Sequence, residues 1–351
     1  MSASPASDPV SLHDVLAWIA ETAGERDAEP LPPFPEEAIQ RLEATGVLGT
    51  NSDAASELDL VRRIAAADGS VGRIVDGHLN GIERLAVQGP AELRERELAE
   101  LRAGRLRIGV WGADPAPGEG PPAAVLGDVL RGVKTFCSGA GGVDRALILA
   151  RSEEPGPPVA VWVDVRDRVS VEVDESWFKG AGLRASVSHR VVFHDAPVLA
   201  QFGVPGAISE QPWFARDALR TAASWAGMAD SAAEGALDEL AARPSEQLEE
   251  LAAGRILGYR GTIDAWLQYA ARAMDDAGPE LPAIAVHARV AIAGAARALL
   301  DEAARACGSR PFARGGRLDR GRRDLELFLL QHRLEPMQAT AGAAALQERR
   351  A

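Results

Sequence analysis

The stretch LRGVKTFCSGAGGVDRALILAR, residues 130–151, decides the fold of this chain. Its second half contains the apolar run 145–150, which has the length and composition of a buried β-strand. The small residues SGAGG at 138–142 separate that run from the preceding residues, as turn residues do. Phe136, Cys137 and Ser138 stand where the preceding segment ends. The stretch therefore predicts β-structure with an aromatic, a thiol and a hydroxyl group gathered at one strand end.

Outward from this stretch, a small β domain is predicted over residues 104–205. Glycine and proline punctuate short runs that are apolar or alternate with polar residues. Runs of about five residues separated by turn signals are typical of a sandwich or barrel, without the long helices that parallel sheets need. The expected strands cover residues 106–111, 123–129, 145–150, 159–165, 169–173 and 190–193.

Helical patterns flank this β domain on both sides. Residues 1–103 are interpreted as an N-terminal helical domain, because apolar residues recur there at helix spacing between proline and glycine breaks. Residues 206–351 are rich in alanine and are predicted to pack as a four-helix bundle. The fold class is therefore α+β and mostly α. The four bundle helices are expected over 213–242, 245–277, 281–306 and 318–349.

Charge and cysteine content restrict the partners and the compartment. The 351 residues include 51 acidic and 38 basic side chains, which give a formal net charge of −13. A field of that sign repels phosphate backbones and anionic lipids, so neither nucleic acid nor a membrane is an expected partner. No uninterrupted apolar run approaches the ~20 residues that span a bilayer. Cys137 and Cys307 form neither a disulfide framework nor a zinc site, so no metal and a cytoplasmic location are expected.

Five segments, taken in chain order, resemble the acyl-CoA dehydrogenase family of flavoproteins. They are FPEEAIQRLEATGVLG (34–49), AAADGSVGRIVDGH (65–78), the opening stretch (130–151), WFKGAGLRASVSHRVVFHDAPV (177–198) and GRRDLELFLLQHRLEP (321–336). The resemblance covers nearly the whole chain. It implies an N-terminal helical domain, a central β domain and a C-terminal four-helix bundle. It also implies FAD at their junction and a homo-oligomer, either a dimer or a tetramer.

The resemblance places a flavin ring against the end of the opening stretch. Phe136 stands where the family commonly has tryptophan and would cover one face of the ring. Cys137 follows it, and the hydroxyl of Ser138 would donate to the reactive edge of the ring. The alternative is a strand end that only packs into the core. For Cys137, an inert packing role is the simpler expectation.

The resemblance implies further cofactor contacts, at positions where this sequence departs from the family pattern. In WGADPAPGEG (111–120), Trp111 would stack on the flavin or fill a domain interface, and Ala113 replaces the family's threonine. The family's arginine that reaches the FAD diphosphate of a neighbouring subunit is not recognisable, and Arg243 is the nearest substitute. Gly308 corresponds to a glycine-rich turn that supports FAD from the partner subunit. A solvated arginine at a helix end is the alternative for Arg243.

The catalytic group decides the chemistry, and two positions compete. Acyl-CoA dehydrogenases use a carboxylate to remove the α-proton of the thioester. Counting eight residues from Asp324, as in most members, gives His332. Counting back from Gly227, as in a minority, gives Asp217, which would be the base of an altered dehydrogenase. Monooxygenases of the same fold carry a histidine near the first position. If this chain is one of them, His332 would be its proton donor at neutral pH. Both residues could instead be surface groups.

Other histidines and one tryptophan complete the candidate site residues. His78 and Trp225 lie on apolar helix faces where the family lines its acyl pocket, although a packing role is the simpler expectation for His78. His189 and His194 lie in a predicted strand and its turn without metal-ligand spacing, so both are expected at the surface. No metal site is expected.

The favoured function is that of an atypical dehydrogenase that oxidises an acyl thioester, bound to CoA or to a carrier protein, with hydride transfer to FAD. The second hypothesis is a flavin-dependent monooxygenase that uses His332 and takes reduced FMN or FADH2 as a cosubstrate with a small-molecule substrate. A third is a degenerate member that binds a ligand without turnover.

Overall fold

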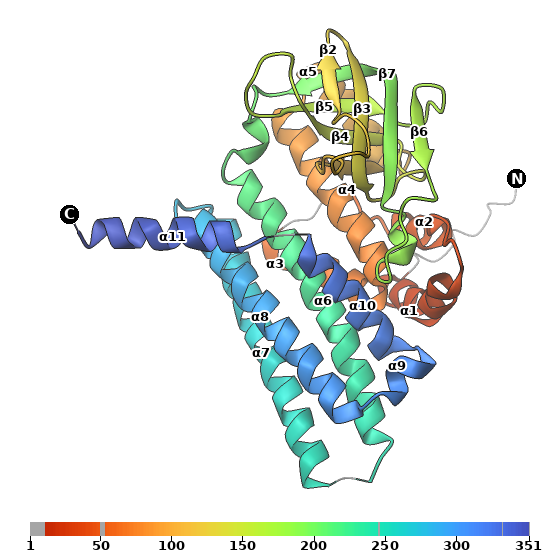
Figure 1. Cartoon of the computed structure of the whole chain (residues 1–351), viewed down its shortest axis with the longest axis vertical. Helices are drawn as coiled ribbons and strands as arrows, with labels where there is room; N and C mark the ends of the chain where they lie inside the picture. The colour runs from red at the N-terminus through yellow and green to blue at the C-terminus, as the bar shows by residue number, and fades with distance from the viewer. Residues whose placement is uncertain (1–10, 50–52, 245, 332, 351) are drawn as a thin grey trace, which may run out of the picture.

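The computed structural model describes residues 11–49, 53–244, 246–331 and 333–350. Helices precede and follow a central β region, in the order expected from the sequence (Figure 1). The helices before it are α1 (Leu12–Ala28), α2 (Glu36–Ala44), α3 (Ala54–Ala67), α4 (Gly69–Gln88) and α5 (Ala91–Arg102). Those after it are α6 (Trp213–Ala241), α7 (Gln247–Asp276), α8 (Leu281–Cys307), α9 (Arg310–Arg314), α10 (Arg317–Leu330) and α11 (Glu335–Glu348).

Seven strands in the described residues form one mixed sheet with the order β1-β4-β5-β7-β3-β2, and β6 pairs with β7. Only β1 and β4 run parallel among these pairs. The first part of β7 pairs with β3 and β6, and its last part pairs with β5. The strands are β1 (Ile108–Trp111), β2 (Ala124–Leu126), β3 (Val129–Cys137), β4 (Arg145–Ala150), β5 (Val159–Asp164), β6 (Val171–Asp174) and β7 (His189–Phe202).

The strand expected over 123–129 is wrong in its extent. A two-residue turn at Gly127–Asp128 splits it, so that Leu126 pairs with Val129 across a hairpin. Gly127 has a φ of 61°, which glycine adopts without steric cost and which two-residue hairpin turns require. After the turn the chain forms β3, and Phe136 lies next to the last residue of that strand. The expected runs did not include residues 130–137, because polar residues interrupt the apolar pattern there, although a strand end was expected at Phe136–Ser138.

The long helices α6, α7, α8 and α10 form the bundle, with α6 at its centre. Two glycines allow α6 and α10 to lie in close contact. A Cβ added to Gly235 would meet the backbone of Leu318 at 2.6 Å, and one added to Gly321 would meet that of Ala232 at 2.9 Å. Glycine at such positions removes the side chain that would otherwise hold two helix backbones apart.

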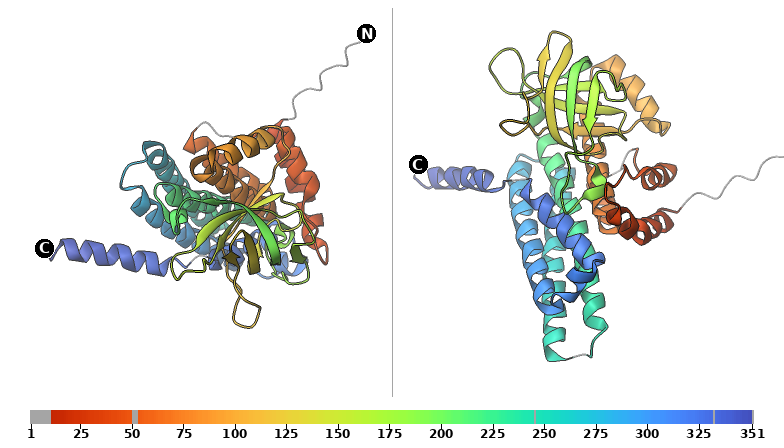
Figure 2. Two further views of the ribbon diagram at one scale, coloured as in Figure 1. Left: turned by 90° about the horizontal axis from the view of Figure 1, so that it is seen from above. Right: turned by 45° about the vertical axis from the view of Figure 1, so that its right-hand side comes forward.

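The single helix expected over 318–349 is wrong, because α10 ends at Leu330 and a new helix, α11, begins at Glu335. Pro336 lies in the first turn of α11. Proline cannot donate the backbone hydrogen bond that a continuous helix needs, and it disfavours the helical conformation of the preceding residue. In Figures 1 and 2, α11 projects away from the body of the molecule.

Helix α4 lies between the β domain and the other helices. A Cβ added to Gly81 would meet the side chain of Ile108 in β1 at 2.2 Å, so this glycine lets the helix lie directly on the sheet. On the same helix, Nδ1 of His78 accepts a hydrogen bond from the backbone N–H of Ile108 at 3.1 Å. The β domain is therefore fixed to the helical core through α4.

Helix α8 is long and apolar enough to cross a membrane by length and composition, as judged within the described residues. It packs against α6 and α7, and 56% of its most apolar window is buried inside the protein. A core helix of a bundle meets the same criteria, and its packing here accounts for its composition.

Candidate functional site

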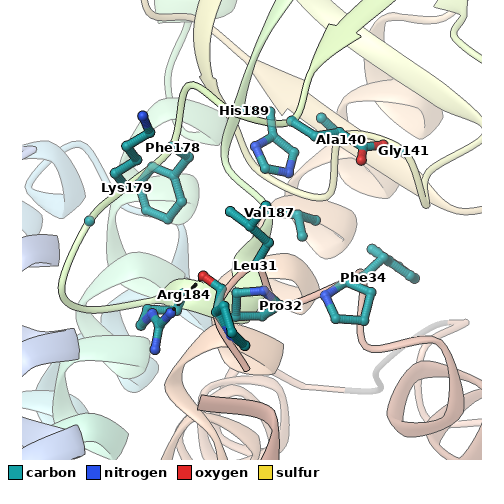
Figure 3. A pocket seen from close by; sticks show the side chains of 14 residues that line it. Leu31, Pro32, Phe34, Ala140, Gly141, Phe178, Lys179, Arg184, Val187 and His189 are labelled. Atoms are coloured by element: carbon teal, nitrogen blue, oxygen red, sulfur yellow. Dashed lines mark hydrogen bonds between the residues drawn. The ribbon is translucent and has the colours of Figure 1, made fainter. Parts of the chain in front are cut away.

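A cavity of about 450 Å³ lies where the β domain meets the N-terminal helices. This seam cavity is lined by the loop 30–34 between α1 and α2, by Ala140 and Gly141 after β3, and by residues between 175 and 189. Figure 3 shows the labelled side chains of these three segments around one space. Its volume lies within the ~300–1,000 Å³ that small-molecule and cofactor sites occupy.

The predicted flavin-contacting residues lie beside this cavity. Phe136 is 40% exposed and packs edge-on against Trp177, with ring centroids 5.0 Å apart. Ser138 is buried, and its Oγ lies 2.8 Å from Oγ of Ser188, which lies 2.8 Å from Oγ of Ser186. The three serines therefore form a buried chain of hydroxyl groups between the strand end and the cavity wall.

Two other predicted residues stabilise the same strand end. Nε1 of Trp111 donates to the carbonyl oxygen of Ser138 at 3.0 Å, so this buried indole holds the turn rather than lying open. Burial raises the pKa of the Cys137 thiol far above its ordinary value. The thiol therefore stays protonated and unreactive, which agrees with the packing role. Ala113 is exposed, and its carbonyl accepts from the N–H of Thr135 at 3.1 Å.

Backbone strain is concentrated at this seam. Phe136, Leu183 and Val187 have φ values of 52°, 51° and 42°, in the left-handed region that bulky residues rarely adopt. Val187, which lines the cavity, is β-branched and has the highest steric cost of the three. Strained residues of this kind occur where the surrounding structure holds them for binding or catalysis. The seam is therefore the best candidate for the functional site.

His189 also lines the seam cavity, and its expected surface position is wrong. Its side chain is 8% exposed, and Nδ1 has no hydrogen-bond partner among the described residues. Burial lowers the pKa of His189, so the imidazole is neutral at physiological pH. The period-2 pattern could have revealed this position, because His189, Val191 and Phe193 alternate on the buried face of β7. His194 is exposed, as expected, and pairs with Glu172.

The loop that carries Leu183 and Val187 is fixed by α10. Oδ1 of Asp324 accepts from the N–H of Leu183 at 2.5 Å, and Arg323 donates to the carbonyl of Ala181. Arg323 is also paired with Asp27 of α1 at 2.6 Å. The Arg-Asp pair that the family resemblance picked out therefore acts here as a clamp between bundle and β domain.

We expect Asp324→Asn to change how stability depends on pH. Burial raises the pKa of Asp324 to about 7, with neighbouring carboxylates adding to the effect. The folded state therefore binds this proton more tightly than the unfolded state, and stability falls as pH rises from about 4 to 7. An asparagine side chain at this position cannot ionise. From pH 4 to 7 the free energy of unfolding of the variant should therefore rise by roughly 2–4 kcal/mol relative to that of the wild type. Urea unfolding at several pH values measures this difference, with the exposed Asp301→Asn as the control for the substitution. A difference in unfolding free energy between Asp324→Asn and the wild type that stays the same at every pH would contradict this prediction.

Asp217 is held in an ion pair away from the seam cavity. Its Oδ2 accepts from Nε and Nη2 of Arg84 at 3.0 and 2.5 Å, and its Oδ1 lies 3.4 Å from Nη1 of Arg220. Burial raises the pKa of Asp217 to about 6 in spite of these cations. Oδ2 thus joins α6 to Arg84 of α4, and Oδ1 contacts Arg220 within α6 itself. The competing candidate, His332, lies outside the described residues, so its role stays a prediction.

Arg243 and Gly308 lie together at the end of α8. Arg243 donates from Nη1 to the carbonyl of Ala306 at 2.9 Å and from Nη2 to that of Cys307 at 2.6 Å. Gly308 follows the helix with a φ of 71°, which favours glycine. In the isolated chain this arginine caps a helix end, and its contact with a neighbouring subunit stays a prediction.

His78 and Trp225 are buried in different places. His78 bridges α4 and β1, and burial lowers the pKa of its imidazole to about 4, so it is a neutral acceptor. Trp225 in α6 is fully buried, packs edge-on against Phe328 at 6.2 Å, and has the guanidinium of Arg289 at 5.1 Å from its ring centroid. The structure does not bring these two residues together, and their substrate contacts stay a prediction.

Comparisons with known proteins agree with this architecture. No protein-family model matches the chain. The dibenzothiophene monooxygenase of Rhodococcus erythropolis is 28% identical over 217 residues, a match that covers 55% of this chain and 50% of that protein. The chain thus matches about half the length of this curated relative.

Solved structures resemble the chain over nearly its whole length. The FMN-bound dibenzothiophene monooxygenase of Paenibacillus sp. A11-2 superposes with a TM-score of 0.80 and 20% identity, covering 95% of this chain and 96% of that one. Butyryl-CoA dehydrogenase from Megasphaera elsdenii has a TM-score of 0.79 and 17% identity, covering 96% and 99%. The chain therefore has the acyl-CoA dehydrogenase fold, and its sequence is similar to that of dibenzothiophene monooxygenases over about half its length.

Proposed function

We propose that this chain is a flavin-dependent monooxygenase that inserts one atom of dioxygen into a small organic molecule, with reduced FMN as the cosubstrate. The observation that carries the proposal is the sequence match to dibenzothiophene monooxygenase, at 28% identity over 217 residues. It supports the second hypothesis from the sequence over the favoured dehydrogenase. The FMN-bound structural relative supports FMN over FAD.

The position of Asp217 argues against the dehydrogenase. Removal of an α-proton needs a carboxylate oxygen that is free to accept it within hydrogen-bond reach of the substrate. Both oxygens of Asp217 are already held by Arg84 and Arg220. The other family position for the base holds His332, which is not an acid. The chain therefore offers no free carboxylate at either position.

The residues at the seam fit a flavin. The exposed ring of Phe136 and its neighbour Trp177 offer an aromatic surface, and the buried hydroxyl of Ser138 follows at the end of the same strand. Nδ1 of His189, which has no hydrogen-bond partner among the described residues, offers a further polar atom at the wall of the seam cavity. A reduced flavin would supply the electrons that activate dioxygen. The chain's own residues would orient it, exclude water and, through Ser138 and Ser188, hold or pass a proton.

An isotope experiment tests the proposal. The purified chain is mixed with FMN, NADH, an FMN reductase and dibenzothiophene or indole under ¹⁸O₂, and products are analysed by mass spectrometry. One ¹⁸O atom per product molecule is the expected result. In the opposing arm, oxidised protein-bound flavin is mixed anaerobically with butyryl-CoA. Bleaching of the flavin in this arm, without any ¹⁸O product in the first arm, would show a dehydrogenase and contradict the proposed monooxygenase.

We expect Ser138→Ala to lower the rate of oxygen transfer by roughly 10–100-fold. The variant removes the one hydroxyl of the serine chain that lies at the strand end, and hydrogen bonds to charged groups contribute about 1.5–3 kcal/mol. Ser170→Ala is the matched control, because Ser170 is also buried in the β domain but bonds to Asp167 instead. Steady-state kinetics with saturating reduced FMN measures the effect. Equal rates for the two variants would remove Ser138 from the site.

We further propose that the chain is a homo-oligomer, as the family resemblance implies. Helix α11 supports this, because none of its residues is buried in the single chain and it projects from the body (Figure 2). Light scattering of the purified protein gives the number of subunits directly.

A further inference from the structure

A second cavity, of about 350 Å³, lies between α6, α8 and α11. We name it the α6–α8–α11 cavity. Its walls are almost entirely apolar, and the one charged residue among the described residues that line it is Arg289 of α8. The apolar walls include Phe214, Ala218, Val286 and Met337.

Arg289 is a buried cation that forms no ion pair with any of the described residues. Its side chain is 4% exposed, and neither Nε nor Nη2 has a hydrogen-bond partner among the described residues. Nη1 has only the sulfur of Met337, at 4.0 Å. The other buried arginines of this region differ, because Arg84 is paired with Asp217 and Arg220 with Glu57 and Glu83.

The acid whose charge acts on Arg289, Asp76, does not hydrogen-bond to it. Asp76 attracts it electrostatically, but the oxygens of Asp76 already accept from Arg73, Asn80 and Thr221. Burial lowers the pKa of Arg289 to about 10, so the guanidinium is charged at neutral pH. A buried charge with free donors is costly unless a partner of opposite charge completes it.

We propose that the α6–α8–α11 cavity binds a small organic acid, with its anionic head group on Arg289 and its apolar body against the alanine, valine and phenylalanine walls. A guanidinium presents two parallel N–H donors that match a carboxylate or a sulfinate. The guanidinium of Arg289 also lies over the ring of Trp225, 5.1 Å from the ring centroid.

Binding to the flavin-free protein tests the site separately from turnover. Benzoate and benzenesulfinate are titrated by calorimetry against benzamide, which has the shape of benzoate without its charge. Both acids should bind at least ~10-fold more tightly than benzamide. A preference for one acid over the other identifies the head group. Equal affinities of benzoate and benzamide would overturn the proposal.

Variants assign the binding to this cavity. Arg289→Met should weaken benzoate binding ~10-fold or more and leave benzamide unchanged, whereas Arg297→Met, an exposed arginine of the same helix, should change neither. Ala218→Phe should block both ligands by filling the cavity. Arg289→Met should also raise the melting temperature, because it removes an unpaired buried charge. A lower melting temperature together with unchanged benzoate binding would show that Arg289 is only structural.

The two proposals fail separately. Benzoate binding that depends on Arg289, without any ¹⁸O product from any substrate, would leave the acid site standing and remove the monooxygenase. Oxygenation of dibenzothiophene by Arg289→Met at the wild-type rate, without benzoate binding to the wild type, would do the opposite.

Discussion

Arg84→Met is expected to lower the free energy of unfolding by about 3–5 kcal/mol. Arg84 is 1% exposed at its side chain and donates to Asp217 and to the carbonyl of Ile208. Methionine has a similar length but no charge, so the variant leaves a carboxylate that is only 20% exposed with Arg220, at 3.4 Å, as its remaining cation. Urea unfolding monitored by circular dichroism measures the loss.

The double variant Arg84→Met/Asp217→Leu is the matched control. It removes both charges, so most of the lost stability should return, because an apolar pair of similar volume often replaces a buried ion pair without cost. The same proteins test the role of Asp217. If Asp217 is structural, Asp217→Asn should retain oxygen transfer. Loss of turnover in a stable, well-folded Asp217→Asn would make this carboxylate catalytic after all.

Gly182→Ala is expected to destabilise the chain by about 3 kcal/mol and to lower turnover with it. The added Cβ would lie 2.0 Å from the carbonyl oxygen of Arg323 and 2.7 Å from the backbone N of Asp324. Because these are backbone atoms of α10, no side-chain rotation relieves the clash. The loop 181–187 would have to move off the helix, and with it the wall of the seam cavity.

Gly156→Ala is the control for this second substitution. Its Cβ would meet nothing within 4 Å, and it lies in a loop of the same β domain. Thermal unfolding and the ¹⁸O assay are run on both variants. Equal melting temperatures for the two would mean that the loop does not depend on contact with α10.

The sequence predicts the elements of this fold better than the contacts between them. The apolar run 145–150, the alanine-rich helices and the order of the three regions follow local rules of periodicity and turn chemistry. The break at Pro336 also had a local signal, which the expected 318–349 helix ignored. By contrast, Arg84 and Asp217 lie 133 residues apart, and nothing in either neighbourhood indicates that they meet.

The candidate site could be predicted only in part, again because contacts between distant segments leave no local signal in the sequence. Phe136 and Ser138 stand out because a family resemblance selects them, and the strained backbone at Phe136 is visible only in the structure. His189 could have been placed on the inner face of β7 by alternation. Arg289 carries no signal, since an arginine on an alanine-rich helix looks like a solvated one until the packing removes its water.

The sharing of β7 between two sets of neighbours limits how this β domain can vary. Its first residues pair with β3 and β6 and its last ones with β5, so a one-residue insertion in the middle would reverse the facing of every side chain on one side of it. Length changes are therefore expected in the connections, such as the segment 115–122, or at irregularities like the one that the pairing of β7 with β5 already contains between Trp162 and Val163. Over evolutionary time, new specificities on this scaffold would come from altered loops around a β7 strand whose length changes little.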